Sequence, residues 1–365
     1  MAEVPAVDLV IASHDPRRRV GRAVASVLEG PQVRTRVTVV AHNTDVAGME
    51  EAMRRDGVDV TELIARGSLR VLSLTDGVAS PAGPFNLGLD RADAEFVAVM
   101  GSDDELEPGA VASWLALAGL AGAAAVIPRQ RHASGVAITT PVARPGRTVG
   151  LDLVRDRLAY RSAPLGLVAR AEVARLGLRF LEGVAVGEDI AFATRVWAEG
   201  SVAFDRNGPA YVVRDDAPFR VTTAPRPLRS EFAWLDAMLD DGWLTGLDRL
   251  RRAAVVTKFV RTHVFGAVLN RPDPAIWTDV ERGALRHAAV RLIAVEPTAI
   301  EPLSVADRRL LDAMLDVTVP AGRLVGLAAA RRHFGRPTTL VPRNPLWIAH
   351  REAPPRFMAA SLLVR

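Results

Sequence analysis

The sequence predicts an α/β domain with a mostly parallel sheet over residues 1–225, followed by an α-helical domain over residues 226–365. In the first 130 residues, short apolar runs alternate with helical stretches, as crossover connections between parallel strands require. After residue 230 the pattern becomes helical, with little strand signal. A chain of 365 residues, 49% of them apolar, is long enough and apolar enough to form two domains, each with its own core.

The predicted strands of the first domain are apolar runs of seven residues. They are VDLVIAS (7–13), RVTVVAH (36–42), SLRVLSL (68–74), EFVAVMG (95–101) and AAVIPRQ (124–130). Several are apolar throughout rather than alternating, which is typical of strands covered on both faces. Helices are predicted between them, over 17–30, 46–57, 85–94 and 108–121.

The rest of the chain has fewer signals. Residues 131–186 are rich in turn residues and predict no regular element, whereas 187–200 predict a helix. In the second domain, helices are predicted over 231–244, 246–269 and 277–295.

Composition excludes several classes of site. The chain has no cysteine, so it has no disulfide, thiolate metal site or cysteine nucleophile, which fits a reducing compartment. No basic region precedes a long apolar stretch at the N-terminus, and the longest apolar stretch is too short to span a bilayer. We therefore expect a soluble, cytoplasmic protein.

Common catalytic and nucleotide-binding motifs are missing from the sequence. GxGxxG, GxxxxGK[ST], GxSxG and HExxH do not occur, and the seven histidines show no zinc-ligand spacing. Dinucleotide-binding, P-loop, serine hydrolase and zinc protease functions therefore lose their main support.

An acidic cluster, GSDDE (101–105), follows the fourth predicted strand. Crowded carboxylates repel one another unless water, a helix N-terminus or a cation compensates them. One interpretation is a solvated turn with acids near the start of the next helix. The other is a site for Mg²⁺ or Mn²⁺ carrying a diphosphate, because ligands of parallel sheets bind beyond the carboxyl ends of the strands.

A second acidic pair, Glu188 and Asp189, lies at the start of the helix predicted over 187–200. The pair fits a helix cap, because the helix dipole stabilises negative charge at the N-terminus. The same effect keeps a carboxylate ionised, and thus available as a general base near neutral pH. Both interpretations remain open at this stage.

In order along the chain, four segments resemble the inverting family-2 glycosyltransferases of the GT-A fold. They are VDLVIASHDPRRRVGRAVASVLEG (7–30), FNLGLDRADAEFVAVMGSDDELEPGAV (85–111), LGLRFLEGVAVGEDIAFATRVWAEG (176–200) and PAYVVRDDAPFRVTT (209–223). The resemblance covers residues 7–223 and implies a metal-dependent transfer of a sugar from a UDP- or GDP-sugar donor, with inversion at the anomeric carbon. It implies a glycan or polyprenyl-linked acceptor, as in cell-envelope polysaccharide synthesis.

The resemblance also implies roles for individual residues. Asp103 would hold the divalent metal on the donor diphosphate, and Asp104 would contact the metal or the ribose. Asp189 would take the proton from the acceptor hydroxyl, and Glu188 would orient the acceptor. Further residues are implied to bind the donor: Ser13, Asp15, Asn86 and Arg214.

The sequence departs from the family pattern at several positions, among them Gly101, residues 39–45, Phe85 before Asn86, and Asp215 and Asp216 after Arg214. Gly101 stands where the first aspartate of the Asp-x-Asp motif often lies, so Asp103 would carry more of the metal binding. Family members often have aspartates after the second strand to hold the nucleobase, whereas this chain reads VVAHNTD (39–45). His42, Asn43 or Asp45 would substitute there.

The C-terminal tail is basic. Residues 320–365 contain eight arginines and one acid, Glu352, together with Phe334, Trp347 and Phe357. Such a tail fits contact with anionic lipid headgroups, a polyprenyl phosphate or an acidic glycan. It fits equally a basic surface whose aromatic residues are buried against the helical domain or a second copy of the chain. No motif supports nucleic-acid binding.

Two other functions remain compatible with the residues. Gly101 and the AHNTD sequence fit a non-catalytic protein that has kept the fold and serves as a scaffold or binding partner. A sugar-phosphate nucleotidyltransferase would usually have a glycine-rich basic loop after the first strand, and ASHDPRRR has the arginines without the glycines.

Overall fold

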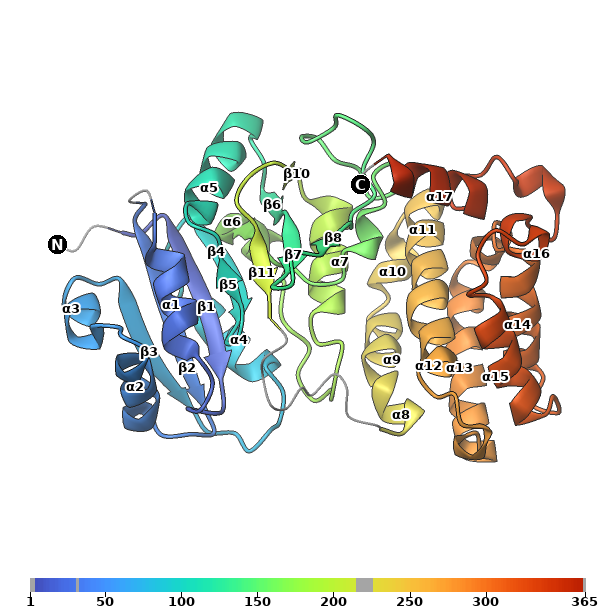
Figure 1. Ribbon diagram of the computed structural model, residues 1–365, viewed down its shortest axis with the longest axis horizontal. Coiled ribbons are helices and arrows are strands. Elements are labelled where there is room, and N and C mark those ends of the chain that lie inside the picture. Colours follow the sequence, from blue (N-terminus) through green and yellow to red (C-terminus); the bar gives the residue numbers. More distant parts are fainter. Residues whose placement is uncertain (1–3, 31–32, 215–225, 364–365) are drawn as a thin grey trace. The chain divides into compact units, whose positions relative to one another are not determined.

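A computed structural model describes residues 4–30, 33–214 and 226–363 (Figure 1). The chain divides into two compact units. Unit 1 comprises Met1–Thr140, Gly146–Asp152 and Arg161–Ala224, and unit 2 comprises Pro141–Pro145, Leu153–Tyr160 and Pro225–Arg365. The sequence placed one boundary at 225/226 and did not anticipate that two earlier segments pack with unit 2.

Unit 1 is built on a seven-stranded sheet of order β10-β6-β9-β4-β1-β2-β3. Its strands are β1 (Val7–Ser13), β2 (Thr35–His42), β3 (Leu69–Leu74), β4 (Phe96–Gly101), β6 (Ala125–Pro128), β9 (Leu167–Ala169) and β10 (Val202–Asp205). The pairs β1/β2, β1/β4, β2/β3 and β6/β10 are parallel, and β9 runs antiparallel to β4 and β6. The prediction of an α/β fold with a mostly parallel sheet is confirmed.

The helices of unit 1 follow the predicted alternation (Figure 1). They are α1 (Val20–Leu28), α2 (Val46–Arg55), α3 (Val60–Ala65), α4 (Ala82–Arg91), α5 (Ala110–Ala121), α6 (Arg170–Arg175) and α7 (Ile190–Glu199). Side-chain caps fix two of the starts, because Asp45 accepts from the Gly48 amide at α2 and Asp59 from the Glu62 amide at α3.

Strand β1 is buried on both faces. Leu9 and Ile11 belong to a cluster with Val24 of α1 and Trp114 of α5. Successive side chains of a strand point to opposite faces, so Val10 faces the other way, where it meets α4. This double coverage explains the uninterrupted apolar run in the sequence.

A second, four-stranded sheet of unit 1 has the order β5-β11-β7-β8. Its strands are β5 (Glu105–Leu106), β7 (Gln130–His132), β8 (Ala137–Ile138) and β11 (Tyr211–Val213). The antiparallel pairing of β11 with β5 places Tyr211 opposite Leu106. A segment more than 100 residues away is thereby brought to the acidic cluster.

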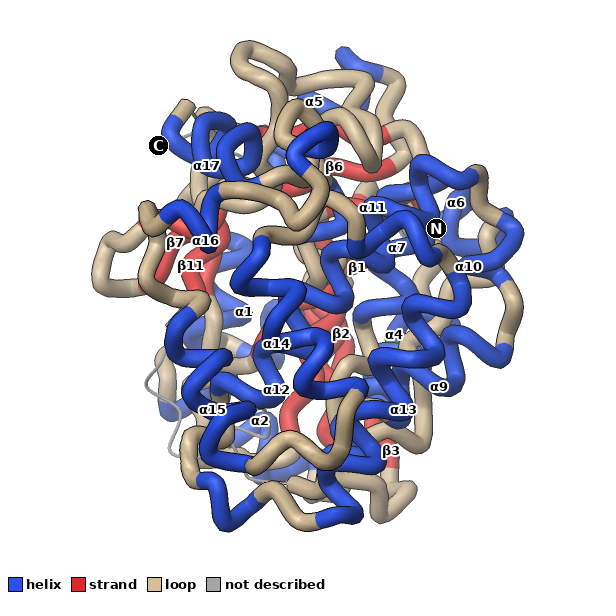
Figure 2. The backbone as a smooth tube through the Cα atoms, turned by 90° about the vertical axis from the view of Figure 1, so that its right-hand side faces the viewer, coloured by secondary structure: helices blue, strands red, loops and turns tan. Residues whose placement is uncertain are grey.

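Unit 2 is helical, as predicted. Its helices of at least five residues are α9 (Ala233–Asp240), α11 (Arg249–Phe259), the π-helical η3 (Val260–Val264), α12 (Phe265–Leu269), α13 (Asp279–Val295), α14 (Val305–Leu315), α15 (Ala321–Ala330) and α17 (Pro354–Leu362). Its shorter helices are η1 (Leu158–Tyr160), α8 (Leu228–Glu231), α10 (Trp243–Gly246), η4 (Pro274–Ile276), η5 (Pro297–Ile300), α16 (Pro337–Leu340) and η6 (Pro345–Trp347). Figure 2 shows α12, α13, α14 and α15 side by side, and α14 contacts both α13 and α15.

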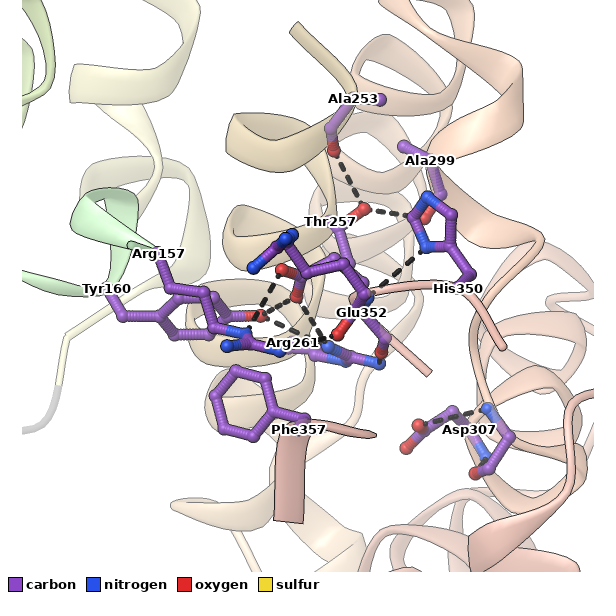
Figure 3. Close-up of polar contacts among 12 residues, drawn as sticks. Arg157, Tyr160, Ala253, Thr257, Arg261, Ala299, Asp307, His350, Glu352 and Phe357 are labelled. Atoms are coloured by element: carbon purple, nitrogen blue, oxygen red, sulfur yellow. Dashed lines mark hydrogen bonds and ion pairs between the residues drawn. The ribbon is translucent and has the colours of Figure 1, made fainter. Parts of the chain in front are cut away.

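A polar cluster within unit 2 joins segments distant in sequence (Figure 3). The Tyr160 hydroxyl donates to Glu352 Oε2 at 2.8 Å, and Arg261 Nη1 donates to the same oxygen at 3.0 Å. The Phe357 ring lies 4.9 Å from the Tyr160 ring, with the Arg157 guanidinium 5.2 Å from its centroid. Phe357, one of the aromatic residues of the basic tail, is thus packed within unit 2.

Within the described ranges, no helix is both long enough and apolar enough to cross a bilayer.

Candidate functional site

The carboxyl ends of three neighbouring strands lie at one edge of the large sheet. In the register of β1 with its neighbours, Ser13 pairs with Ala41 of β2, and Ala12 pairs with Gly101 of β4. Ser13, His42 and the acidic cluster after Gly101 are therefore gathered at the same edge, where parallel sheets bind their ligands.

Asp103 is held by an arginine from the turn after β1. Arg18 Nη1 lies 2.7 Å from Asp103 Oδ2 and 3.2 Å from Ser102 Oγ. Arg22 Nη2, from α1, donates to the backbone carbonyl of Asp103 at 2.8 Å. The side chains of Arg18 and Asp103 are only 14% and 16% exposed, so solvent screens this ion pair weakly.

Asp104 is held by β11 and the residue that follows it. The Tyr211 hydroxyl donates to Asp104 Oδ2 at 2.6 Å, and the Arg214 amide donates to Oδ1 at 3.0 Å. Burial and the neighbouring Asp104 carboxylate raise the pKa of Tyr211 well above its ordinary value, so its hydroxyl keeps its proton. The same hydroxyl accepts the Gly101 amide at 3.1 Å.

Gly101 leaves no space for a side chain in this arrangement. A Cβ atom at this position would lie 2.6 Å from Asp104 Oδ2. The glycine that departs from the Asp-x-Asp pattern therefore leaves free the space that the Asp104 side chain occupies.

Arg214 and Arg22 share a carboxylate. Arg214 Nη2 lies 2.7 Å from Glu105 Oε2, and Arg22 Nε lies 2.7 Å from Glu105 Oε1. The resemblance implied that Arg214 binds the diphosphate, and this ion pair places its guanidinium beside the acidic cluster. Residues 215–223, the remainder of the fourth family-like segment, lie outside the described residues.

His42 lies at the end of β2 in a polar group with residues that follow β3. His42 Nε2 is 2.8 Å from Asp76 Oδ1, and Asn43 Nδ2 is 3.1 Å from His42 Nε2. Asn43 adopts a positive φ of 52°, and its Oδ1 accepts the amides of Asp76 and Gly77. The Val78 amide lowers the pKa of Asp76 against the opposing effect of desolvation. Asp45 is separate from this group and caps α2.

The turn after β1 is shaped by Asp15. Its Oδ1 accepts both the Arg17 amide and Arg17 Nε at 2.9 Å, and its backbone carbonyl accepts from Ser13 Oγ at 3.3 Å. The bond from Arg17 lowers the pKa of Asp15 to about 2. Burial, followed by Arg18, lowers the pKa of the intervening His14, which favours its neutral form at pH 7.

Asn86 on α4 supports the second acidic pair rather than the strand ends. Its Nδ2 donates to the Phe180 carbonyl at 2.9 Å and to Glu182 Oε1 at 2.8 Å, and its Oδ1 accepts the Phe180 amide. The Leu181 amide in turn donates to the Glu188 carbonyl at 2.9 Å. Asn86 thus helps to position the loop that leads to α7.

Glu188 and Asp189 are half-buried and lie immediately before α7. The Asp189 carbonyl accepts the Ala193 amide at 2.9 Å, so the helix begins at Ile190 rather than at 187. The side chain of Asp189 makes no capping hydrogen bond to α7. Its carboxylate lies at the positive end of a helix dipole, and the role of general base stays a prediction.

Four residues of this edge were not singled out from the sequence: Arg18, Arg22, Asp76 and Tyr211. The arginine run directly after the first predicted strand was a signal for Arg18. Tyr211 lies in the fourth family-like segment, 209–223, but its pairing with Asp104 was not visible in the sequence. Asp76 had no signal.

Asp103 and Asp104, the two carboxylates predicted to hold Mg²⁺ or Mn²⁺, both have partners within the protein, and their role as metal ligands stays a prediction. Among the ranges that the structure describes, no three His, Asp or Glu side chains are grouped so that they could hold a metal ion. Gly101 provides no ligand, Asp103 is paired with Arg18, and each oxygen of Asp104 accepts a hydrogen bond.

The chain is similar to known proteins in its structure. No protein-family model matches the chain, and no curated protein matches its sequence. Among solved structures, Staphylococcus aureus TarS 1–349 in complex with UDP-GlcNAc has a TM-score of 0.72 at 14% identity, covering 89% of this chain and 91% of that one. The UDP complex of TarS 1–349 has a TM-score of 0.69 at 15% identity, with the same coverage.

The longer TarS structure extends beyond the region of likeness. Its TM-score is 0.66 at 15% identity, and the match covers 89% of this chain but 55% of that one. These likenesses, together with the sheet order and the helical unit 2, show that the chain has a GT-A-like fold followed by a helical region.

Proposed function

We propose that this protein is a glycosyltransferase that moves a sugar from a nucleotide-sugar donor to an acceptor hydroxyl, with inversion. The observation that carries the proposal is the gathering of Ser13, His42 and Asp103 at the carboxyl edge of a GT-A-like sheet. TarS, a protein of similar fold, was crystallised with UDP-GlcNAc and with UDP.

The proposed donor site uses the residues that the structure brings to this edge. The polar turn of Ser13 and Asp15 follows β1, and the His42–Asn43–Asp76 group follows β2 and β3. Imidazole, amide and carboxylate groups are suited to hydrogen bonding with a nucleobase and a ribose. We place the nucleoside here and the diphosphate toward residues 101–105 and Arg214.

The proposed reaction is a single displacement. Asp189 accepts the proton of the acceptor hydroxyl as its oxygen forms a bond to the anomeric carbon. The bond from that carbon to the phosphate oxygen breaks, and the electron pair leaves with the nucleoside diphosphate. Attack from the opposite face inverts the anomeric centre. Glu188 is proposed to orient the acceptor.

The acceptor is proposed to be a glycan or a polyprenyl-linked saccharide. The arginines of residues 320–365 favour a polyanionic or phosphate-bearing acceptor. The protein would act in the cytoplasm, at the inner face of the membrane where the acceptor is polyprenyl-linked.

The first test is isothermal titration of the protein with UDP and with GDP, each in EDTA and in Mn²⁺. Saturable binding of one of them in either buffer supports the proposal and identifies the nucleotide of the donor. Failure of both to bind at millimolar concentration in both buffers would favour the scaffold interpretation.

The second test concerns the base. D189N is expected to lower kcat about 10²- to 10⁴-fold, because the amide cannot accept the proton. Donor binding should stay within about twofold of wild type, since the base contacts the acceptor. E51Q, which changes an exposed carboxylate of α2, is the matched control. Wild-type turnover by D189N would refute the assigned role.

A further inference from the structure

We propose that Arg18, assisted by Arg22, supplies the positive charge opposite the donor diphosphate, and that Asp103 positions Arg18 rather than binding a divalent metal. The inference rests on the proposed function and specifies how its donor site handles the charge of the leaving group. It is carried by the ion pairs around the acidic cluster in the described part of the chain.

The first step concerns residue 101. A divalent cation prefers several oxygen ligands, and carboxylates are the usual protein source. Gly101 contributes none, and a Cβ there would lie 2.6 Å from Asp104 Oδ2. Residue 101 is thus no metal ligand, and a side chain there would displace Asp104 Oδ2 from the Tyr211 hydroxyl.

The second step concerns Asp104. Its Oδ2 accepts from the Tyr211 hydroxyl at 2.6 Å, and its Oδ1 accepts from the Arg214 amide at 3.0 Å. Tyr211 is 1% exposed, and its own oxygen accepts the Gly101 amide. The two bonds tie the strand β11 to the end of β4, so this carboxylate has a structural task.

The third step concerns Asp103, the remaining carboxylate. Arg18 Nη1 lies 2.7 Å from its Oδ2, and both side chains are mostly buried. A metal ion on Oδ2 would meet a guanidinium at contact distance, and like charges at this range repel strongly where solvent is scarce. The cation position beside Asp103 is already taken by a side chain of the protein.

Arg22 adds a second guanidinium from α1. It donates from Nη2 to the Asp103 carbonyl at 2.8 Å and pairs through Nε with Glu105 at 2.7 Å. His14, in the same turn, has a pKa lowered by burial and favours its neutral form at pH 7. Charge at the turn after β1 therefore comes from arginine, whose planar donors match phosphate oxygens.

These contacts predict that Arg18 changes its partner when the donor binds. The β-phosphate competes with Asp103 for Arg18, while Arg22 stays anchored to residues 103 and 105. When the bond between the anomeric carbon and the phosphate oxygen breaks, the developing charge on the nucleoside diphosphate faces guanidinium groups. Such a site binds and stabilises the diphosphate without a metal ion.

The experiment uses the full chain and whichever of UDP or GDP binds in the titration described above. Affinity for the nucleoside diphosphate and for the corresponding monophosphate is measured in 1 mM EDTA and in Mn²⁺. For wild type we expect diphosphate affinities within about twofold of each other in the two buffers. A loss of ten-fold or more in EDTA that Mn²⁺ restores would overturn the inference while leaving the proposed function intact.

The variant R18Q tests the arginine directly. Removing a charge-assisted bond should weaken diphosphate binding about 10- to 100-fold and reduce the preference for diphosphate over monophosphate. R18K keeps the charge but loses the planar fork, so we expect an intermediate affinity. R19Q, at the neighbouring 60% exposed arginine paired with Asp56, should bind like wild type. Equal binding by R18Q and R19Q would overturn the inference.

D103N separates positioning from metal binding. If Asp103 positions Arg18, D103N retains binding in EDTA, weakens it less than R18Q does, and shows no dependence on Mn²⁺. If Asp103 is a metal ligand, D103N is the more damaging change and abolishes any Mn²⁺ effect. Thermal unfolding of each variant in the absence of nucleotide shows whether the affinity change occurs in a folded protein. If R18Q is unstable, the double variant R18Q/D103N is used instead, because it removes both charges of the ion pair.

Discussion

Gly101 illustrates how one missing side chain shapes the site at the scale of the residue. Because it has no Cβ, Asp104 can fold back over it and accept the Tyr211 hydroxyl, which in turn accepts the Gly101 amide. Hydrogen bonds thereby link Gly101 of β4, Asp104 in the following turn and Tyr211 of β11. The glycine is a requirement of this geometry.

G101A is therefore expected to be destabilising. A methyl group 2.6 Å from Asp104 Oδ2 must push that short side chain away from Tyr211, at a cost of about 1 to 2 kcal/mol in the free energy of unfolding. Urea denaturation measures the change. The control is G119A in α5, where a Cβ meets nothing within 4 Å and alanine should stabilise the helix by up to about 1 kcal/mol. Equal stability of the two variants would contradict this account.

His263 is a buried imidazole beside the single lysine of the chain. Its Nε2 lies 2.9 Å from Lys258 Nζ, and the Trp234 ring lies 4.8 Å from its own. Burial and then the charge of Lys258 lower the pKa of His263 well below 6.5. The unfolded chain therefore binds a proton that the folded chain refuses, and stability falls as the pH drops below about 6.5.

H263F removes the imidazole that is protonated only in the unfolded chain. Unfolding of this variant in acid should therefore take up one proton fewer than unfolding of wild type. Between pH 6.5 and 5 the free energy of unfolding should decline less steeply than in wild type, by up to about 1.4 kcal/mol per pH unit. Urea denaturation at several pH values provides the slopes. H287Q, which alters a 60% exposed imidazole, should keep the wild-type slope. An unchanged slope in H263F would mean that other groups cause the acid sensitivity.

At the scale of the element, the contact between β1 and α4 depends on a close approach of backbone to side chain. A Cβ at Gly88 of α4 would lie 2.3 Å from Cγ1 of Val10 in β1. Alanine is a better helix former than glycine, so helix propensity and packing act in opposite directions here. Packing should prevail, because both elements are fixed by the sheet.

G88A is thus expected to lower the free energy of unfolding by about 2 to 3 kcal/mol, as overpacked cores do. Thermal or urea unfolding tests this. Its partner is G283A in α13, a helical glycine with nothing within 4 Å of its Cβ, which should instead gain up to about 1 kcal/mol. A stabilised G88A would show that α4 can move away from the sheet.

The elements differ in how far the sequence could predict them. Runs such as 7–13 and 95–101 were predicted because both faces of β1 and β4 are buried and most of their residues are apolar. The strands β9 and β10 were missed, since they have only three and four residues. Both segments lack the length over which a period can be recognised.

The candidate site was predicted in its acids but not in its pairings. The position of Asp103 after a buried strand located the ligand edge. Its partner Arg18 is 85 residues away, and the partner of Asp104, Tyr211, is 107 residues away. Such pairings depend on sheet order and register, which a single sequence does not specify, so the sequence predicted the acids without their partners.

At the scale of the whole molecule, the two units are interleaved along the chain. Segments 141–145 and 153–160 pack with unit 2, although most of that unit follows residue 225. The segment 153–160 contacts the polar cluster centred on Glu352 (Figure 3). Glu352 is 4% exposed. Removing its charge leaves two arginines without their shared carboxylate.

E352Q is expected to lower the free energy of unfolding of unit 2 by about 3 to 5 kcal/mol, the cost of breaking a buried ion pair. Hydrogen exchange should report faster exchange at Leu158 and Tyr160, whose segment is tied through the Tyr160 hydroxyl. E301Q is the control, because Glu301 is 37% exposed and lies 3.6 Å from Arg308, where the loss should be below about 1 kcal/mol. Similar effects of the two variants would contradict a central role for Glu352.

The interleaving has a consequence for the order of events during synthesis. Tyr160 and its partner Glu352 are 192 residues apart. At about 5 to 20 residues per second, the ribosome needs about 10 to 40 s to make the second after the first. Throughout that interval residues 153–160 have been synthesised, but Glu352, to which the Tyr160 hydroxyl donates, has not. Unit 2 can therefore bind residues 153–160 through Glu352 only after that glutamate has left the ribosome.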